Sequence, residues 1–443
     1  MENLNGAFRE SLVEAIGSAN ADIAFEAFDR APSVSVRLNP GKPGADLGSG
    51  DPVPWCRHGL MLSERPSFTL DPAFHAGAYY VQDSSAMFVG CVARLFIERK
   101  DRPLRVLDLC AAPGGKTTDL AASLREVCGD SFLLVANEVM KQRAQILCDN
   151  VGRWGDPNVV VTSVDPTAFG SLEGFFDIIV ADVPCSGEGM FRKDDEAVRQ
   201  WSEDNVALCE ARQRRIVADV WGALADGGTM VYSTCTFNSR ENDGNIRWMI
   251  GNLDASAVTM DLDYPGVIRT EFGFSLVPGL VRGEGQYCSA VRKNGGSSAR
   301  IRPFRPAKGP SFDRLFNTGM EFIQKNGTVI AVPRVIASEV EALAPLRPLM
   351  KGVAVGEVKG KDLVPHADLA LADCLSDDAF PMVEVDRQTA LAFLHKDPIV
   401  LKDAPRGLII VCYGSLKLGF VKNLGNRCNN LLPQGRRIRM DIV

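Results

Sequence analysis

Hydrophobic positions in the middle of the chain follow two alternating periods. From about residue 83 to 252, short runs rich in Val, Ile and Leu alternate with segments whose apolar residues recur at helical spacing. Strands that alternate with helices predict a parallel sheet covered on both faces, the architecture of an α/β domain. The predicted strands are residues 105–110, 131–138, 158–165, 176–183 and 227–236, and the predicted helices are residues 86–99, 117–125, 141–151, 205–224 and 242–252.

The two ends of the chain have shorter patterns. Phe8, Leu12 and Ile16 recur every four residues and predict a short amphipathic helix, and residues 33–38 alternate like a strand. Residues from about 45 to 80 contain four prolines and predict irregular structure. The C-terminal region predicts mixed α+β structure, with strands at 328–332, 352–357, 408–413 and 417–422.

Length and composition divide the chain into three folded parts. A chain of 443 residues suggests three domains, at about 150 residues each. Residues 295–310 are rich in Gly, Ser and Pro without a hydrophobic period, which is typical of a linker. We therefore expect an N-terminal accessory segment at 1–82, a doubly wound domain at 83–294 and a C-terminal module at 311–443.

The distribution of charged residues along the chain bears on the kind of partner it can bind. Hydrophobic residues make up 46% and charged residues 23% of the chain, which excludes a disordered or collagen-like protein. The net charge of −6 argues against a general polyanion binder, but residues 291–310 and 415–440 each carry six basic residues and no acid. Such clustering favours a localised phosphate-binding surface, and so an RNA partner.

Targeting and metal-binding signals are missing from the pattern. The N-terminus does not resemble a signal peptide, and no apolar run reaches the roughly 18 residues of a membrane span. We expect a cytoplasmic protein without a membrane partner. The 12 cysteines and four histidines form no CxxC or HExxH motif, so no metal site is predicted.

A glycine-rich turn between the first predicted strand and helix of the α/β domain indicates a ligand loop. Glycine allows the backbone to approach a ligand, and the following helix offers free N–H groups. The turn fails the P-loop pattern because Cys110 stands where the first glycine is required, and it lacks the GxGxxG of dinucleotide sites. S-adenosylmethionine (SAM) is the remaining common ligand.

Acidic residues at the ends of three successive strands support this interpretation. Glu138 ends the second predicted strand and suits the ribose hydroxyls, and Asp165 ends the third and suits the adenine amino group. Asp182 ends the fourth strand. A lone Asp at such a position is often a helix N-cap, but three in succession favour a ligand site.

Two cysteines follow neighbouring strands. Cys185 comes after the fourth strand and Cys235 after the fifth, so both are expected at the same edge as the ligand loop. Most cysteines are buried core residues, yet a loop position beside a ligand favours reactivity.

At this level the chain resembles the RsmB/Nop family of RNA cytosine-C5 methyltransferases. The motifs that carry the resemblance are DLCAAPGGKTT (108–118), DVPCSGEG (182–189), RKD (192–194) and YSTCTFNSRENDGNI (232–246), and residues 283–287 resemble the last core strand. The GEG after PCS and the extra C-terminal region look most like the RsmF-type branch, which methylates 16S ribosomal RNA.

The resemblance implies a Rossmann-like SAM-dependent methyltransferase core and a PUA-like RNA-binding module. It implies that Cys235 is the nucleophile that adds to C6 of the cytosine and that Cys185 assists product release. From the chemistry of the base, Asp182 near N3 is a candidate catalytic residue that donates or holds a proton as the ring gains charge. The implied SAM contacts are Cys110, Ala111, Ala112, Pro113, Gly114, Gly115, Lys116, Glu138, Asp165 and Asp182. The expected partner is 16S rRNA or the small ribosomal subunit, bound by a monomer.

Two alternatives stay open at this level. The catalytic motifs do not distinguish ribosomal RNA from transfer RNA as the substrate. A non-catalytic RNA-binding assembly factor would also carry the basic stretches, although it would need neither Cys185 nor Cys235.

Overall fold

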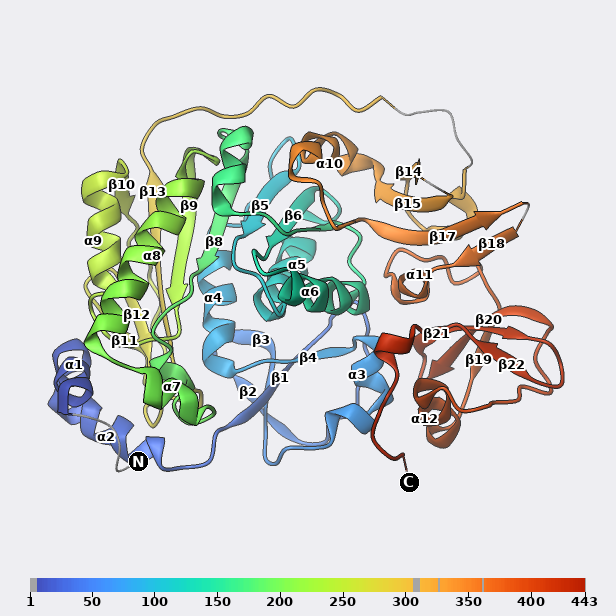
Figure 1. The fold of residues 1–443 in the computed structure, drawn as a ribbon, viewed down its shortest axis with the longest axis horizontal. Helices are drawn as coiled ribbons and strands as arrows, with labels where there is room; N and C mark the ends of the chain where they lie inside the picture. The colour runs from blue at the N-terminus through green and yellow to red at the C-terminus, as the bar shows by residue number, and fades with distance from the viewer. Residues whose placement is uncertain (1–5, 306–310, 326, 361, 443) are drawn as a thin grey trace.

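A ten-stranded sheet forms the centre of the protein in the computed structural model, which describes residues 6–305, 311–325, 327–360 and 362–442 (Figure 1). Its strand order is β11-β12-β13-β9-β8-β5-β6-β7-β16, and β10 pairs with β13. The strands are β5 (Leu104–Asp108), β6 (Phe132–Asn137), β7 (Val159–Thr162), β8 (Phe176–Asp182), β9 (Leu224–Thr234), β10 (Ala255–Ala257), β11 (Ile268–Arg269), β12 (Gly273–Leu276), β13 (Gln286–Lys293) and β16 (Met350–Lys351).

The middle of this sheet is parallel and doubly wound. β5 pairs in parallel with both β6 and β8, β6 pairs with β7, and β8 pairs with β9. The chain runs outward from β5 to β7 and then returns to the other side of β5 at β8, so the order reverses between β5 and β8. Ligands in such sheets bind at the strand ends beside this reversal. The predicted Rossmann-like fold class is confirmed.

Helices cover both faces of the parallel strands. Successive side chains of a strand point to opposite faces of the sheet, and both faces are apolar. On one face, Val106 packs with residues of α4, α5 and α6, and on the other, Leu107 packs with residues of α8 and α9. These helices are α4 (Ser84–Arg94), α5 (Gly115–Cys128), α6 (Lys141–Trp154), α8 (Glu203–Trp221) and α9 (Asp243–Asn252).

The N-terminal segment contains more regular structure than its prolines predict. The expectation of irregular structure at 45–80 is wrong, because β1 pairs with β3 and β4, and β2 pairs with β3, in an antiparallel sheet. Pro52 fits within β2 because that strand lies at the edge of the sheet. The elements are α1 (Gly6–Ile16), α2 (Ser18–Phe28), β1 (Val34–Leu38), β2 (Gly50–Val53), β3 (Cys56–Leu62), α3 (Pro72–Ala76) and β4 (Tyr79–Val81).

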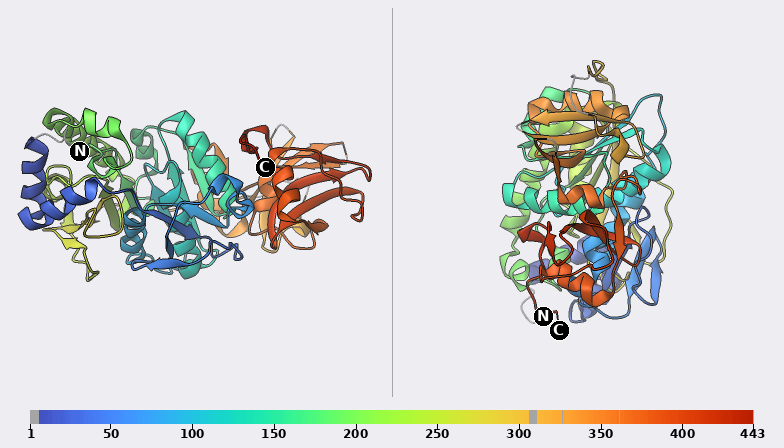
Figure 2. Two further views of the ribbon diagram at one scale, coloured as in Figure 1. Left: turned by 90° about the horizontal axis from the view of Figure 1, so that it is seen from below. Right: turned by 90° about the vertical axis from the view of Figure 1, so that its right-hand side faces the viewer.

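The C-terminal region forms two four-stranded sheets, where the sequence predicts one module. The first sheet contains β14 (Met320–Lys325), β15 (Thr328–Pro333), β17 (Val353–Lys359) and β18 (Asp362–Pro365). The second contains β19 (Met382–Glu384), β20 (Gly407–Tyr413), β21 (Leu416–Asn423) and β22 (Cys428–Asn430), with α12 (Arg387–His395) packed against it. Both lie at one end of the elongated molecule (Figure 2).

The segment before these sheets runs along the α/β domain. Arg292 and Lys293 belong to β13, so this part of the predicted basic stretch is sheet. Ala299 N donates to Gly174 O, and Phe304 N donates to the Ser338 hydroxyl. Residues 306–310, which include Lys308, lie outside the described residues. In the part of the chain that is described, no helix is long and apolar enough to span a membrane.

Candidate active site

The predicted ligand loop connects β5 to α5 beside the point where the strand order reverses. Gly114 has φ of +115°, a conformation that favours glycine, and it directly precedes the first residue of α5. Asp108 is fully buried at the end of β5 and accepts a hydrogen bond from the Thr117 hydroxyl at 2.7 Å. Burial raises the pKa of Asp108 to about 7.

Lys116 and Asp182 form an ion pair across the loop. Lys116 Nζ lies 2.8 Å from Asp182 Oδ2. The Ser233 hydroxyl and the Gln286 amide donate to Asp182 Oδ1 at 2.7 and 3.1 Å. Burial lowers the pKa of Lys116, but attraction to Asp182 outweighs burial, so the pKa is raised and the ammonium stays charged. The structure therefore brings a fixed positive charge to the ends of β5 and β8.

The two cysteines meet at the same edge. Cys185 follows β8 and Cys235 follows β9, and the parallel pairing of these strands places Asp182 opposite Ser233. The two Sγ atoms are 3.2 Å apart. The hydrogen bond to Cys235, together with burial, raises the pKa of Cys185 well above its ordinary value. Cys185 is therefore a protonated thiol that can donate to the sulfur of Cys235.

Two buried glutamates hold the cysteine loops, a role that the sequence reasoning missed. Glu241 accepts hydrogen bonds from Ser186 N at 3.0 Å and from the Gln213 amide at 2.6 Å. Glu188 accepts from Phe237 N at 2.6 Å. Each carboxylate belongs to one cysteine motif and binds the backbone of the other. The signal was present as charged residues inside motifs next to a cysteine, GEG and NSREN.

Glu138 and Asp165 occupy different environments. Glu138 is 4% exposed, accepts from Met140 N at 2.9 Å and pairs with Arg143 at 3.4 Å. Asp165 is exposed, and its Oδ1 accepts from both the backbone N and the hydroxyl of Thr167. These hydrogen bonds lower the pKa of Asp165. Asp165 thus caps the short helix at Pro166–Leu172.

The other loop residues present backbone groups. Arg143 donates to Ala112 O at 2.7 Å, and Asn150 donates to Pro113 O at 2.7 Å, so α6 holds the loop from behind. Ala111 N donates to Asn137 O. Burial raises the pKa of Cys110, which keeps this thiol protonated. Within the described ranges, no group of three His, Cys, Asp or Glu is placed to hold a metal ion.

The basic stretches are partly neutralised. In the tail, Arg436 pairs with Asp149 and Asp368, and Lys417 pairs with Asp377. Arg437 and Arg439 are exposed. Lys422 and Arg427 are exposed as well, so the positive charge that faces solvent is spread along this stretch.

Three family models match the chain. Residues 95–292 match the model described as 16S rRNA methyltransferase RsmB/F, and residues 4–84 match the N-terminal domain of 16S rRNA methyltransferase RsmF. Residues 380–438 match the methyltransferase RsmF PUA domain. The PUA match corresponds to the second C-terminal sheet and not to the first.

Known proteins agree with these matches. The chain is 32% identical to ribosomal RNA small subunit methyltransferase F of Erwinia tasmaniensis, covering 86% of this chain and 84% of that protein. It is 33% identical to the protein of the same name from Serratia proteamaculans, covering 87% and 84%.

Solved structures support the same fold. A methyltransferase homologue from Pyrococcus horikoshii has a TM-score of 0.54 and 25% identity, over 65% of this chain and 95% of that chain. NSun6 from the same organism, solved with SFG, has a TM-score of 0.53 and 19% identity, over 65% and 98%.

These similarities confirm the resemblance that the two cysteine motifs and the ligand loop indicate. The chain belongs to the RsmB/F family and is a SAM-dependent RNA (cytosine-5) methyltransferase.

Proposed function

We propose that the protein methylates C5 of a cytosine in 16S rRNA through a covalent bond between Cys235 and C6 of the base, resolved with help from Cys185. The observation that carries this proposal is the pair of thiols, 3.2 Å apart, beside the ion pair of Lys116 and Asp182. A ribosomal substrate is supported by the relatives named ribosomal RNA small subunit methyltransferase F, which match most of the chain.

The residues of the loop fit SAM. Asp108 Oδ1 is buried and has no hydrogen-bond partner among the described residues, so a donor or cation of a ligand can satisfy it. Glu138 is a buried carboxylate at the end of β6 that suits a pair of hydroxyls. Bound there, SAM supplies the methyl group on a positively charged sulfur. The proposed contacts are Cys110, Ala111, Ala112, Pro113, Gly114, Gly115, Lys116, Glu138, Asp165 and Asp182.

Cys235 begins the reaction as the nucleophile. C5 of cytosine is a poor nucleophile, but addition of a thiolate at C6 turns C5 into an enamine carbon that can take the methyl group. The ion pair of Lys116 and Asp182 lies at the same strand ends as Cys235, and the sulfur of Cys185 lies 3.2 Å from that of Cys235. The target base must leave its stack to reach these sulfurs.

Cys185 assists the release of the product. After methylation, the C5 proton passes to solvent, the C5–C6 double bond forms again, and the C6–Sγ bond breaks with its electron pair returning to Cys235. The Cys185 sulfur lies 3.2 Å from that of Cys235, so its thiol is placed to donate a hydrogen bond that makes Cys235 a better leaving group. When the thiolate adds at C6, N3 takes up a proton from solvent, and Asp182, which Lys116 and Ser233 orient, accepts a hydrogen bond from that N–H. The proton returns to solvent when the C6–Sγ bond breaks.

Substitution of each cysteine tests the mechanism. Cys235→Ala removes the nucleophile and is expected to abolish transfer of a labelled methyl group to RNA. Cys185→Ala is expected to accumulate a protein–RNA adduct that survives denaturing electrophoresis. Cys428→Ala, a half-buried cysteine of β22, is the control and should keep the wild-type rate. Normal turnover by Cys185→Ala, with no adduct, would contradict the assignment of Cys185.

The choice of RNA is tested separately. Purified small ribosomal subunits and bulk transfer RNA are offered to the wild-type enzyme with labelled SAM, and modified cytosines are located by bisulfite sequencing. We expect methylation of 16S rRNA alone. Methylation confined to transfer RNA would keep the chemistry and change the substrate, and no methylation of either would favour a non-catalytic assembly factor.

A further inference from the structure

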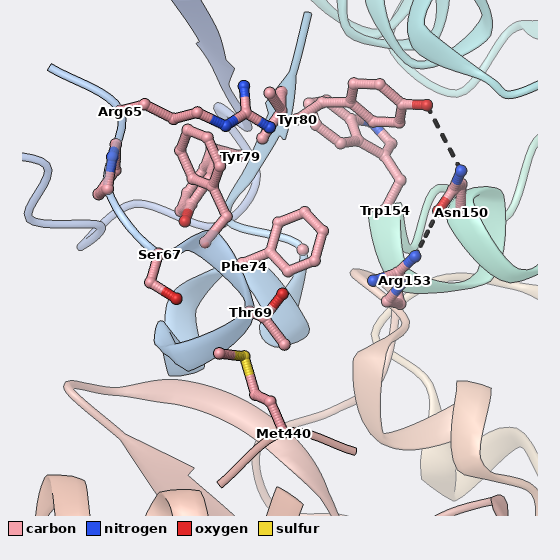
Figure 3. Close-up of a pocket in the computed structure, with 14 residues that line it drawn as sticks. Arg65, Ser67, Thr69, Phe74, Tyr79, Tyr80, Asn150, Arg153, Trp154 and Met440 are labelled. Carbon is pink, nitrogen blue, oxygen red and sulfur yellow. Dashed lines mark hydrogen bonds between the residues drawn. The ribbon is translucent and has the colours of Figure 1, made fainter. Parts of the chain in front are cut away.

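A cavity of about 470 Å³ lies outside the site described above. It opens between the N-terminal segment, the end of α6 and the C-terminal end of the chain (Figure 3). Phe74 and Tyr80 come from the N-terminal segment, Trp154 from α6 and Met440 from the C-terminal end. Its volume falls within the range of about 300–1,000 Å³ that is typical of small-ligand sites. Three separate parts of the chain therefore build one concave surface.

The lining combines flat aromatic rings with guanidinium groups. The Arg153 guanidinium lies 5.2 Å from the centre of the Phe74 ring, and the Arg65 guanidinium lies 5.4 Å from that of Phe68. Tyr80 is half-buried and presents a further ring. Stacked aromatic and arginine side chains are the surfaces on which unpaired bases bind.

The charged side chains that line the pocket are positive. Both charged residues of the lining, Arg65 and Arg153, are arginines, and the lining contains no carboxylate. Arg65 is exposed and forms no ion pair with any described residue. The nearby Asp71 carboxylate accepts from the Tyr79 hydroxyl at 2.7 Å and from Ala73 N at 3.0 Å, and it forms no ion pair with Arg65 or Arg153. An anionic group such as a phosphate would complement this surface.

Two residues that line the pocket, Tyr80 and Asn150, also contact the ligand loop. Asn150 donates to Pro113 O at 2.7 Å and to the Tyr80 hydroxyl at 3.4 Å. The Tyr80 ring lies 3.4 Å from the position that a Cβ on Gly115 would take. An occupant of the pocket would therefore touch side chains that contact the loop.

We propose that this pocket binds an unpaired nucleotide of the RNA substrate, other than the target cytosine. Its base stacks on the Phe74 and Tyr80 rings, and its phosphate contacts Arg65 and Arg153. The proposal rests on the proposed function in taking RNA as the substrate. It adds a second point of attachment for the strand, held against the loop that carries the methyl donor.

Direct binding of RNA to the full chain tests the pocket without requiring methylation. The probe is fluorescently labelled oligouridylate, titrated at several salt concentrations with Arg65→Ala, Phe74→Leu and the wild type. Phe74→Leu keeps an apolar side chain but removes the ring, so we expect affinity to fall at least about fivefold, the lower limit for one base stack. Arg65→Ala should flatten the slope of log affinity against log salt by about 0.7, the loss of one phosphate contact on a single strand.

A matched pair at the other end of the protein serves as the control. Arg247 on α9 lies 5.6 Å from the centre of the Phe272 ring, at a distant place (Figure 1), and differs from Arg65 in that it pairs with Glu271. Arg247→Ala and Phe272→Leu should bind oligouridylate like the wild type. Equal weakening by the control and pocket variants, or wild-type binding by both pocket variants, would overturn the proposal.

Two further measurements distinguish this proposal from the proposed function and from a site for a free nucleotide. If the protein methylates no RNA but Arg65→Ala and Phe74→Leu still weaken oligouridylate binding, the pocket stands and the proposed function fails. If methylation occurs and these variants raise the KM for RNA but not for SAM, both stand. Binding of uridine monophosphate in the pocket without binding of oligouridylate would assign the site to a free nucleotide and overturn the proposal.

Discussion

Asp108 is a carboxyl group that the fold removes from water at the end of β5. It is fully buried, and the Thr117 hydroxyl is the donor to one of its oxygens. Burial disfavours the carboxylate, which is why the pKa is raised from 3.8 to about 7. At the residue scale, the ligand loop thus contains a carboxyl group whose ionised form is unfavourable because it is buried. A positively charged ligand nearby would stabilise that ionised form.

This burial predicts a stability that depends on pH. Between about pH 4 and pH 7 the folded chain keeps a proton on Asp108 that the unfolded chain has lost, so the free energy of unfolding falls by up to about 1.4 kcal/mol per pH unit. The stability that Asp108 contributes is fully present below about pH 4, and it is lost above about pH 7. Asp108→Asn should remove this slope, measured by urea unfolding from pH 5 to pH 8. Asp261→Asn, at an exposed position, is the control, and an unchanged slope in Asp108→Asn would contradict the assignment.

The helices α3 and α6 meet at their C-terminal ends, a contact that the sequence pattern did not predict. Asn39 donates to Gly77 O at 2.9 Å and to Trp154 O at 3.1 Å. Lys42 donates to Arg153 O at 2.6 Å. Helix ends leave carbonyl groups without partners, so two side chains from the N-terminal segment satisfy both helices at once. At the element scale, this contact fixes one side of the cavity described above.

Gly77 tests that contact. It has φ of +76°, and a Cβ there would lie 2.1 Å from Arg153 O. Gly17 has φ of +81°, but a Cβ there would meet nothing within 4 Å. Gly17→Ala is expected to cost about 1–2 kcal/mol of unfolding free energy, the penalty of the left-handed conformation. Gly77→Ala should cost about 1–3 kcal/mol more because of the clash, and equal losses in urea unfolding would contradict the close approach.

The C-terminal region completes the core of the α/β domain. Met350 of β16 pairs with Val161 of β7, which extends the central sheet by one strand. Ile336 and Leu343 are fully buried in the same cluster as Phe169. The second C-terminal sheet shares a cluster with the N-terminal segment, in which Phe393 packs with Val36 and Tyr79. At the scale of the whole molecule, the parts are therefore expected to unfold together.

Leu343 tests this cooperation. Leu343→Ala is expected to lower the free energy of unfolding by about 2–5 kcal/mol, the usual cost of truncating a buried leucine. Leu349→Ala, at a side chain that is 55% exposed, should change it by less than about 0.5 kcal/mol. Hydrogen exchange of the β6 and β7 amides measures the effect in the α/β domain. Unchanged protection of those amides in Leu343→Ala would mean that the C-terminal region unfolds independently.

The sequence could predict the parallel strands and their helices because each is a local pattern of apolar residues. All five predicted strands of the α/β domain overlap observed strands, with ends that shift by a few residues. The antiparallel edge from β10 to β12 was missed because those strands are only two to four residues long. In the sheet at 34–81, β1 agrees with the strand predicted at 33–38, but β2, β3 and β4 were missed. β2 contains Pro52, β4 is only three residues long, and long-range pairing stabilises all of them.

The sequence by itself determined the α/β class, the family and the ligand loop and cysteines of the candidate site, but not the role of Glu188 and Glu241. These follow from contiguous motifs, such as DLCAAPGGKTT and DVPCSGEG, and from a repeated alternation of strand and helix. Only the tertiary structure decided that the thiols of Cys185 and Cys235, 50 residues apart in the chain, lie 3.2 Å from each other. It also decided that Tyr80, Trp154 and Met440 surround one cavity. Such contacts depend on how distant segments pack, and local hydrophobic periodicity carries no information about that packing.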